Sequence, residues 1–160
     1  RVLFRSMEVF AVNMADYTAL TVVKNLPKGI HSGDRYIKTF PPTPENAAWG
    51  DAYKSKYNEY PTNWSWQNAT AVMFLNEAAK KANSTDGKKL AEVLTGLTIK
   101  CPFGADGTVT MRADDRTLVG YAIGWGTTIP QEPYVLDMKA GDWKTIFELE
   151  AEWKKSKGYT

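Results

Sequence analysis

The sequence has a single cysteine and a single histidine, and their scarcity excludes several kinds of site. One cysteine can form no disulfide within the chain and cannot build a zinc cage. Since a nucleophilic cysteine needs a base, Cys101 would depend on meeting His31 through the fold. The apolar residues around Cys101, Ile99 and Phe103, favour a small buried side chain instead.

Long hydrophobic runs and a strong excess of one charge are also missing. No segment approaches the ~20 apolar residues that a membrane-spanning helix needs. Lys and Arg number 20 against 18 Asp and Glu, so the chain lacks the basic stripe of a nucleic-acid-binding protein. We therefore expect no nucleic-acid partner. The composition, 43% hydrophobic and 24% charged, is typical of a globular chain long enough for one domain.

Motifs of catalysis are absent: there is no Gly-rich phosphate loop, no G-x-S-x-G and no metal-binding histidine spacing. The stretch FGADGTVTMRADD, residues 103–115, does concentrate three aspartates. An EF-hand-like loop needs alternate oxygen ligands before its glycine, and the residues before Gly107 do not supply them. Asp-Gly between extended runs, and Asp114-Asp115 after them, predict two turns. We expect no catalytic residue, metal or cofactor.

The beginning of the chain has two unusual properties. Residues 1–6, RVLFRS, match one reading frame of a common sequencing-library adapter. We interpret them as a non-native scar; a genuine terminal strand is the alternative. The following residues make a poor signal peptide, because Glu8, Asn13 and Asp16 interrupt the apolar segment.

The first structured part has the rhythm of a βαβ unit. Residues 8–13 form a short apolar run typical of a buried strand, and a helix follows that Pro27 and Gly29 stop. Residues 30–40 predict a second strand, parallel to the first.

Helices and then strands follow. Thr43 and Pro44 begin a helix that ends by residues 58–61; a longer helix runs from about Trp64 to Ala82. Thr85 or Asp86 caps a third helix, which Gly96 closes. Strand-like segments at 98–111 and 117–126, a further strand, a turn at 140–142 and a closing helix that ends at Gly158 complete the chain.

The loop after the first strand, residues 13–17, is the best functional position. It lies at the carboxyl end of a predicted parallel strand, where open α/β sheets bind ligands. Asn13 offers an amide, Asp16 a charge, and Tyr17 a ring with a hydroxyl. Asn13 or Asp16 could equally cap the helix that follows.

The order of elements continues through three long stretches: PPTPENAAWGDAYKSKYNEYPTNWSWQNATAVMFLNEAAKKA, LAEVLTGLTIKCPFGADGTVTMRADDRTLVGYAIGWG and DWKTIFELEAEWKK. With this order, the chain after residue 6 resembles the C-terminal part of a type I periplasmic solute-binding protein of an ABC transporter. The group it resembles most is the leucine/isoleucine/valine-binding-like family. The resemblance is specific because the agreement is long and keeps the same order of segments; it does not depend on a short motif.

The resemblance implies an α/β fold: a fragment of a two-lobed type I periplasmic-binding-protein fold, with Rossmann-like parallel sheets flanked by helices. Residues 7–38 would end the second lobe, and residues 39–116 would complete the first lobe with three helices. Residues 117–160 would cross over and return to the second lobe. The lobes of such a protein close on a small ligand.

The resemblance also implies binding without catalysis. The function would be that of the substrate-binding component of an ABC importer for branched-chain amino acids or related small amides and carboxylates. The expected partners are the small ligand, an ABC permease at the membrane and a missing N-terminal half of the same protein. A signal peptide in that missing half would direct the protein to the periplasm or another extracytoplasmic space.

One departure bears on the ligand. Relatives that bind amino acids often carry an acidic residue after the strand that corresponds to VFAVN, and here the loop reads Asn13-Met14-Ala15-Asp16. Either Asp16 takes that role or the ligand is not an α-amino acid. The expected ligand-binding residues are Asn13, Asp16 and Tyr17.

Two other functions stay open. A carbohydrate-binding or hydrolytic module would use the Trp-rich residues 59–67, although Trp64 and Trp66 are spaced for packing rather than for one flat platform. A ligand-sensing domain of a regulator or receptor would use the same fold.

Overall fold

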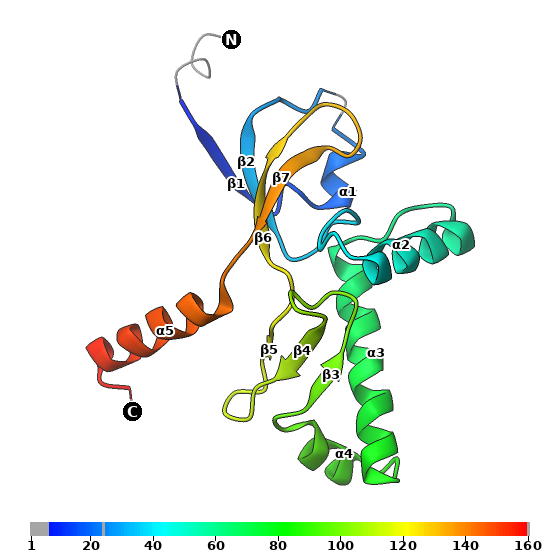
Figure 1. Cartoon of the computed structure of the whole chain (residues 1–160), viewed down its shortest axis with the longest axis vertical. Coiled ribbons are helices and arrows are strands. Elements are labelled where there is room, and N and C mark those ends of the chain that lie inside the picture. Colours follow the sequence, from blue (N-terminus) through cyan, green and yellow to red (C-terminus); the bar gives the residue numbers. More distant parts are fainter. Residues whose placement is uncertain (1–6, 24, 160) are drawn as a thin grey trace.

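A computed structural model describes residues 7–23 and 25–159, which form two units and a projecting helix (Figure 1). The sheet unit contains β1 (Val9–Val12), α1 (Tyr17–Leu20), β2 (Ile30–Asp34), β6 (Gly124–Thr128) and β7 (Val135–Ala140). The helical unit contains the elements between β2 and β6. The suspected scar at residues 1–6 lies outside the described residues.

The predicted βαβ unit is confirmed. β1 and β2 are parallel, with Val9 opposite Ile30 and Val12 opposite Gly33, and α1 lies between them in the sequence. α1 is shorter than expected and ends at Leu20. Three β-branched residues, 21–23, follow it, and such residues have a slightly lower helix propensity.

The second strand ends at Asp34 instead of continuing to residue 40. Two adjacent side chains after it enter different cores. Tyr36 is buried in the helical unit, whereas Ile37 is buried beneath the sheet. A straight strand cannot serve both cores, so the chain bends here.

The four-stranded sheet has the order β1-β2-β6-β7 and is otherwise antiparallel. β6 and β7 are joined by a short connection, which permits only an antiparallel pair. Among the described strands, β1 and β2 are therefore the parallel pair, and their carboxyl ends point toward the helical unit (Figure 1).

The three helices of the helical unit lie where the sequence predicts them: α2 (Pro44–Tyr57), α3 (Asn63–Ala82) and α4 (Gly87–Leu94). The Thr43 hydroxyl accepts a hydrogen bond from the Asn46 N–H at the start of α2, and Asp86 caps α4. No helix in the described part of the chain is long and apolar enough to span a membrane.

A three-stranded antiparallel sheet of β3 (Thr98–Lys100), β4 (Thr108–Met111) and β5 (Leu118–Val119) packs against α3. Its core is formed by aromatic and aliphatic side chains: Tyr36, Trp66, Phe74, Ala78, Leu97, Ile99, Cys101, Phe103 and Val109. Cys101 is buried, as its apolar neighbours predict.

The aspartates of residues 103–115 shape turns, as predicted. Asp106 accepts hydrogen bonds from the N–H and the hydroxyl of Thr108, and Asp115 does the same for Thr117. Within residues 7–23 and 25–159, no group of three or more metal-ligating side chains occurs.

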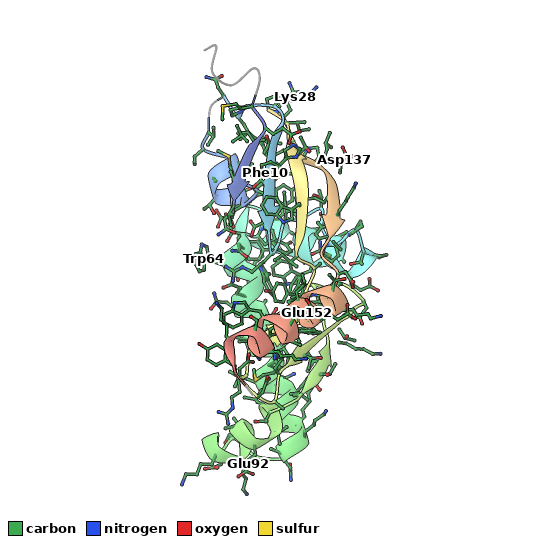
Figure 2. All side chains as sticks on the ribbon, turned by 90° about the vertical axis from the view of Figure 1, so that its left-hand side faces the viewer. Phe10, Lys28, Trp64, Glu92, Asp137 and Glu152 are labelled. Carbon is green, nitrogen blue, oxygen red and sulfur yellow. The ribbon has the colours of Figure 1, made fainter. Side chains whose placement is uncertain are left out.

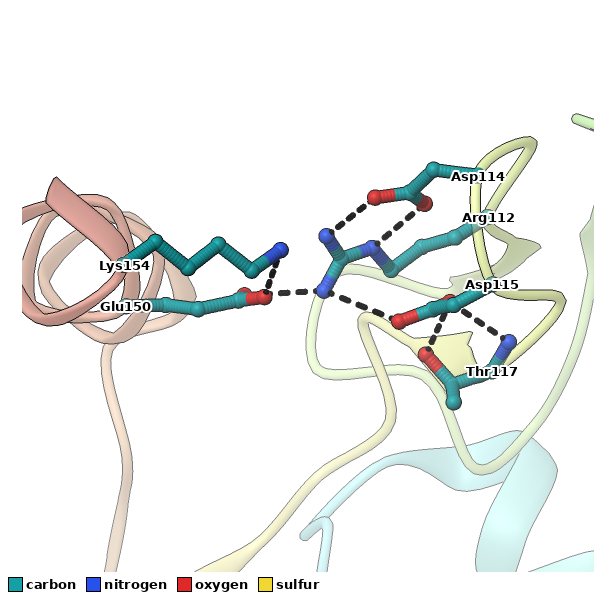
Figure 3. Close-up of polar contacts among 6 residues, drawn as sticks. All are labelled: Arg112, Asp114, Asp115, Thr117, Glu150 and Lys154. Carbon is teal, nitrogen blue, oxygen red and sulfur yellow. Dashed lines mark hydrogen bonds and ion pairs between the residues drawn. The ribbon is translucent and has the colours of Figure 1, made fainter. Parts of the chain in front are cut away.

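The last helix, α5 (Trp143–Lys157), leaves the sheet unit and projects to one side (Figure 1). The predicted turn at 140–142 connects β7, which ends at Ala140, to this helix, which Asp142 caps. Arg112, in the loop after β4, donates a hydrogen bond to Glu150 of α5 at 2.8 Å and pairs with Asp114 in its own loop (Figure 3). Arg112 thus helps to hold α5, and Asp114 orients the Arg112 side chain.

Candidate functional site

The loop after β1 begins at Asn13, which is exposed and has a left-handed backbone with φ of 61°. Asparagine tolerates this conformation better than most residues. Its N–H donates to the Gly33 carbonyl at 3.0 Å, so the loop starts directly beside the end of β2. Asn13 lines an open pocket of about 280 Å³ whose other residues are Val12, Gly33, Asp34, Arg35, Ile123 and Trp125.

Asp16 is buried and bonded on both sides. One carboxylate oxygen accepts from the Thr18 N–H at 2.8 Å and caps α1; the other accepts from the Asn63 N–H at 2.9 Å. Asn63 is the first residue of α3, so Asp16 connects the sheet unit to the helical unit. Its two oxygens already have partners within the protein.

Tyr17 is also buried, in the core that α1 forms with the sheet. Its hydroxyl donates to Glu132 at 2.8 Å, and its ring contacts those of Tyr60 and Tyr134. Burial, together with the Glu132 carboxylate, raises the pKa of Tyr17 well above its usual range. Of the three predicted residues, the structure places Asn13 in the pocket, whereas the buried side chains of Asp16 and Tyr17 bond to other groups of the protein.

Asp34 ends β2 and lines the same pocket as Asn13. Its residue is only 3% exposed. One carboxyl oxygen accepts from the Arg35 N–H at 2.6 Å, and the other has no hydrogen-bond partner among the described residues. Burial raises the pKa of Asp34 to about 7; the Arg35 N–H opposes this shift, and the nearby Asp16 carboxylate adds to it.

Trp125 of β6 forms an apolar wall of the pocket. It lies opposite Gly33 in the sheet register, and a Cβ at position 33 would come within 2.9 Å of its ring. Glycine therefore lets the indole lie against the β2 backbone. The Phe10 ring, 6.3 Å from that of Trp125, continues the aromatic surface (Phe10 is labelled in Figure 2).

Three residues that line the pocket, Asp34, Arg35 and Trp125, were not predicted from the sequence. Asp34 could have been found from the sequence, because it ends the second parallel strand. Ligands bind at the carboxyl ends of such strands, which is the reason that Asn13 was predicted. Trp125 had no such signal, since its position depends on the pairing of β6 with β2.

The two tryptophans at the start of α3, Trp64 and Trp66, lie in different environments. Trp66 is buried, and its indole N–H donates to the Asn63 side chain at 2.8 Å, so it packs as the sequence suggests. Trp64 is 64% exposed (Figure 2). They do not form a shared stacking platform for a sugar.

Comparisons with known proteins agree with this architecture. Residues 4–123 match the family model described as periplasmic binding protein. A search of curated proteins gave no match.

Several solved structures share the fold. A branched-chain amino acid ABC transporter protein from Rhodopseudomonas palustris CGA009 is 20% identical, with a TM-score of 0.67 over 84% of this chain and 35% of that one. A solute-binding protein from R. palustris BisB5, in complex with 3,4-dihydroxybenzoic acid, is 18% identical, with a TM-score of 0.70 over 83% and 36%. The substrate-binding protein LivJ from Streptococcus pneumoniae, in complex with isoleucine, is 16% identical, with a TM-score of 0.66 over 87% and 38%.

The chain thus spans between 35% and 38% of the length of these three structures. The resemblance read from the sequence is confirmed, and the α/β architecture is that of part of a two-lobed binding protein. The chain belongs to the periplasmic binding protein family.

Proposed function

We propose that this chain is the C-terminal part of a substrate-binding component of an ABC importer, whose ligand is an amino acid or a related small carboxylate or amide. The observation that carries the proposal is the match of residues 4–123 to the periplasmic binding protein family. Structural neighbours include complexes with isoleucine, 3,4-dihydroxybenzoic acid and benzoate, which are all small carboxylates. The function is to bind and release, without catalysis.

In this proposal the sheet unit belongs to the second lobe and the helical unit to the first. The return of the chain to the second lobe is supported by the sheet, since β6 and β7 pair beside β2. The boundary at 116/117 falls before β5, which still pairs with β4 in the helical unit. α5 fits this division less closely, because Glu150 contacts Arg112 of the helical unit.

The ligand would bind where the two units meet, at the carboxyl ends of β1 and β2. Asn13 would contact it directly. Asp16 would hold the loop to α3, and Tyr17 would fix the loop to the connection between β6 and β7 through Glu132. Ligand contacts from the rest of the first lobe would complete the site.

The partners follow from this role. The closed, ligand-loaded protein would dock on a membrane permease, because closure changes the surface that the permease meets. An importer component of this kind works outside the cytoplasm, and a signal peptide in the upstream part would direct it there.

Isothermal titration calorimetry tests the proposal. The protein that joins this chain to its upstream coding sequence is titrated with leucine, isoleucine, benzoate and 3,4-dihydroxybenzoate. We expect at least one to bind with micromolar affinity, and the 160-residue chain to bind it at least about 100-fold more weakly, because much of the contact surface is missing. If the longer protein binds none of the four, the proposal fails.

A further inference from the structure

Neither Asn13 nor Asp16 offers a free carboxylate oxygen to a ligand nitrogen. Asn13 is neutral, and both carboxylate oxygens of Asp16 are occupied by backbone N–H groups. We propose that Asp34 is the specificity-determining residue that receives the hydrogen-bond donor of the ligand, an ammonium or amide N–H group. This inference rests on the function proposed above.

The unsatisfied oxygen of Asp34 is the first observation. Buried carboxyl oxygens in folded proteins nearly always have a partner, and leaving one without destabilises the folded state. The Asp34 residue is 3% exposed, yet one of its oxygens has no partner in the described part of the protein. A bound donor would supply the missing hydrogen bond.

The position of Asp34 is the second observation. The bond from the Asn13 N–H to the Gly33 carbonyl places the ends of β1 and β2 together, and Asn13 and Asp34 line one pocket. A ligand nitrogen in that pocket would lie beside the Asn13 amide and the Asp34 side chain, whose free oxygen is covered in this structure and would have to turn toward the pocket. Arg35 also lines the pocket, so the pocket can receive an anionic group as well.

The wall beside Asp34 indicates the remaining chemistry of the ligand. Trp125 lies against Gly33, directly next to Asp34 in the sequence, and presents an apolar ring. An apolar wall excludes water and strengthens a charged hydrogen bond nearby. The pocket therefore favours a small molecule that combines a nitrogen donor with an apolar body.

The binding test uses the longer protein with three probes: isoleucine, 3-methylpentanoate, which is isoleucine without its amino group, and benzoate. We expect Asp34→Asn to weaken isoleucine binding at least about 10-fold, the usual effect of removing a charged hydrogen-bond partner. Binding of the two probes without nitrogen should be unchanged. Asp51→Asn, at an exposed carboxylate of α2, is the matched control.

The outcomes separate the two proposals. Equal isoleucine affinity in Asp34→Asn and the unaltered protein overturns the role of Asp34 but leaves the importer function standing. Binding of benzoate but not of isoleucine does the same, because the ligand then has no nitrogen donor. No binding of any probe by the unaltered protein rejects the proposed function.

A second measurement needs no ligand and uses the 160-residue chain. Because Asp34 carries a buried oxygen without a partner in the described part of the chain, Asp34→Asn should leave the melting temperature unchanged or raise it. Residues that serve ligand binding commonly lower the stability of the unliganded protein, because their polar groups lack partners until the ligand binds. Asp16→Asn should lower the melting temperature, since both of its oxygens have partners. A fall of several degrees in Asp34→Asn would show a structural role and overturn the inference.

Discussion

The two buried aspartates of the sheet unit differ in how their carboxyl oxygens are used. Asp16 accepts backbone hydrogen bonds on both oxygens and joins α1 to α3. Within the described residues, Asp34 has a partner on one oxygen only. Removing each carboxylate should therefore have opposite consequences for the free energy of unfolding.

Asp16→Ala should lower the free energy of unfolding by about 2 kcal/mol, because it removes a helix cap and leaves the buried Asn63 N–H without a partner. Urea unfolding followed by circular dichroism measures the change. Asp106→Ala is the control, since Asp106 is exposed and bonds only to Thr108; its effect should stay within about 0.5 kcal/mol. Equal effects would contradict the bridging role of Asp16.

Asp34 should also make stability depend on pH. Its folded-state pKa of about 7 lies above the ordinary value of 3.8, so the folded chain holds a proton that the unfolded chain has already released. The folded state consequently loses stability as the pH rises from about 4 to 7. The melting temperature of Asp34→Asn should equal that of the unaltered chain near pH 4 and exceed it increasingly toward pH 7. A difference independent of pH would disprove the shift.

Among the elements, α5 has few contacts and is held at two places. The Trp143 indole N–H donates to the Tyr121 carbonyl at 2.7 Å at the start of the helix. Farther along, Glu150 accepts from Arg112 at 2.8 Å and from Lys154 of its own helix (Figure 3). Several apolar side chains of α5 remain exposed, so the Arg112 contact has a large share in its placement.

Arg112→Met should loosen the second half of α5 while its start stays in place. We expect faster amide hydrogen exchange after Glu150 and a change of less than about 1 kcal/mol in the free energy of unfolding, because the ion pairs are partly exposed. Lys144→Met, which breaks a pair within α5, serves as the control. Unchanged exchange in Arg112→Met would mean that other contacts position the helix.

At the scale of the whole molecule, a cluster of Lys38, Glu132, Tyr17 and Tyr60 connects the two units. Lys38 follows β2, pairs with Glu132 between β6 and β7, and lies 3.4 Å from the centre of the Tyr60 ring between α2 and α3. Tyr17 donates to the same Glu132 oxygen. The hydrogen bond from Lys38 lowers the pKa of Glu132 below its usual range, and the hydrogen bond from Tyr17 adds to this effect.

A double-mutant cycle on this cluster should give a measurable coupling. For Lys38→Met and Glu132→Gln we expect about 1 kcal/mol, because the Lys38 side chain is only 17% exposed. The exposed pair Lys80–Glu77 on α3 is the control and should give less than about 0.5 kcal/mol. The measurement is urea unfolding of all variants, and similar couplings for the two pairs would contradict a connecting role.

The free edge of the four-stranded sheet affects how the whole chain behaves in solution. β1 is an edge strand, and its Phe10 is 65% exposed, a combination that promotes pairing between chains. Phe10→Lys should shift the chain from larger species toward monomer in sedimentation velocity at increasing concentration. Val72→Lys, at a similarly exposed (66%) residue of α3, should have a smaller effect because it is not on a strand edge.

By itself, the sequence determined the elements that depend on neighbouring residues. The caps Thr43 and Asp86 set the starts of α2 and α4, and the Asp106 and Asp115 turns follow from local hydrogen bonds. The parallel pair β1–β2 and the family resemblance were also accessible. These features rest on contacts within a few positions or on the order of segments along the chain.

Only the tertiary structure decided how the site is built. The Asp16 carboxylate meets Asn63, 47 positions away, and Tyr17 meets Glu132, 115 positions away. Trp125 reaches Gly33 through the pairing of β6 with β2, and no described residue offers a partner to the second oxygen of Asp34. Whether a buried carboxylate is satisfied depends on groups that folding brings from distant segments, and no local pattern in the sequence encodes that.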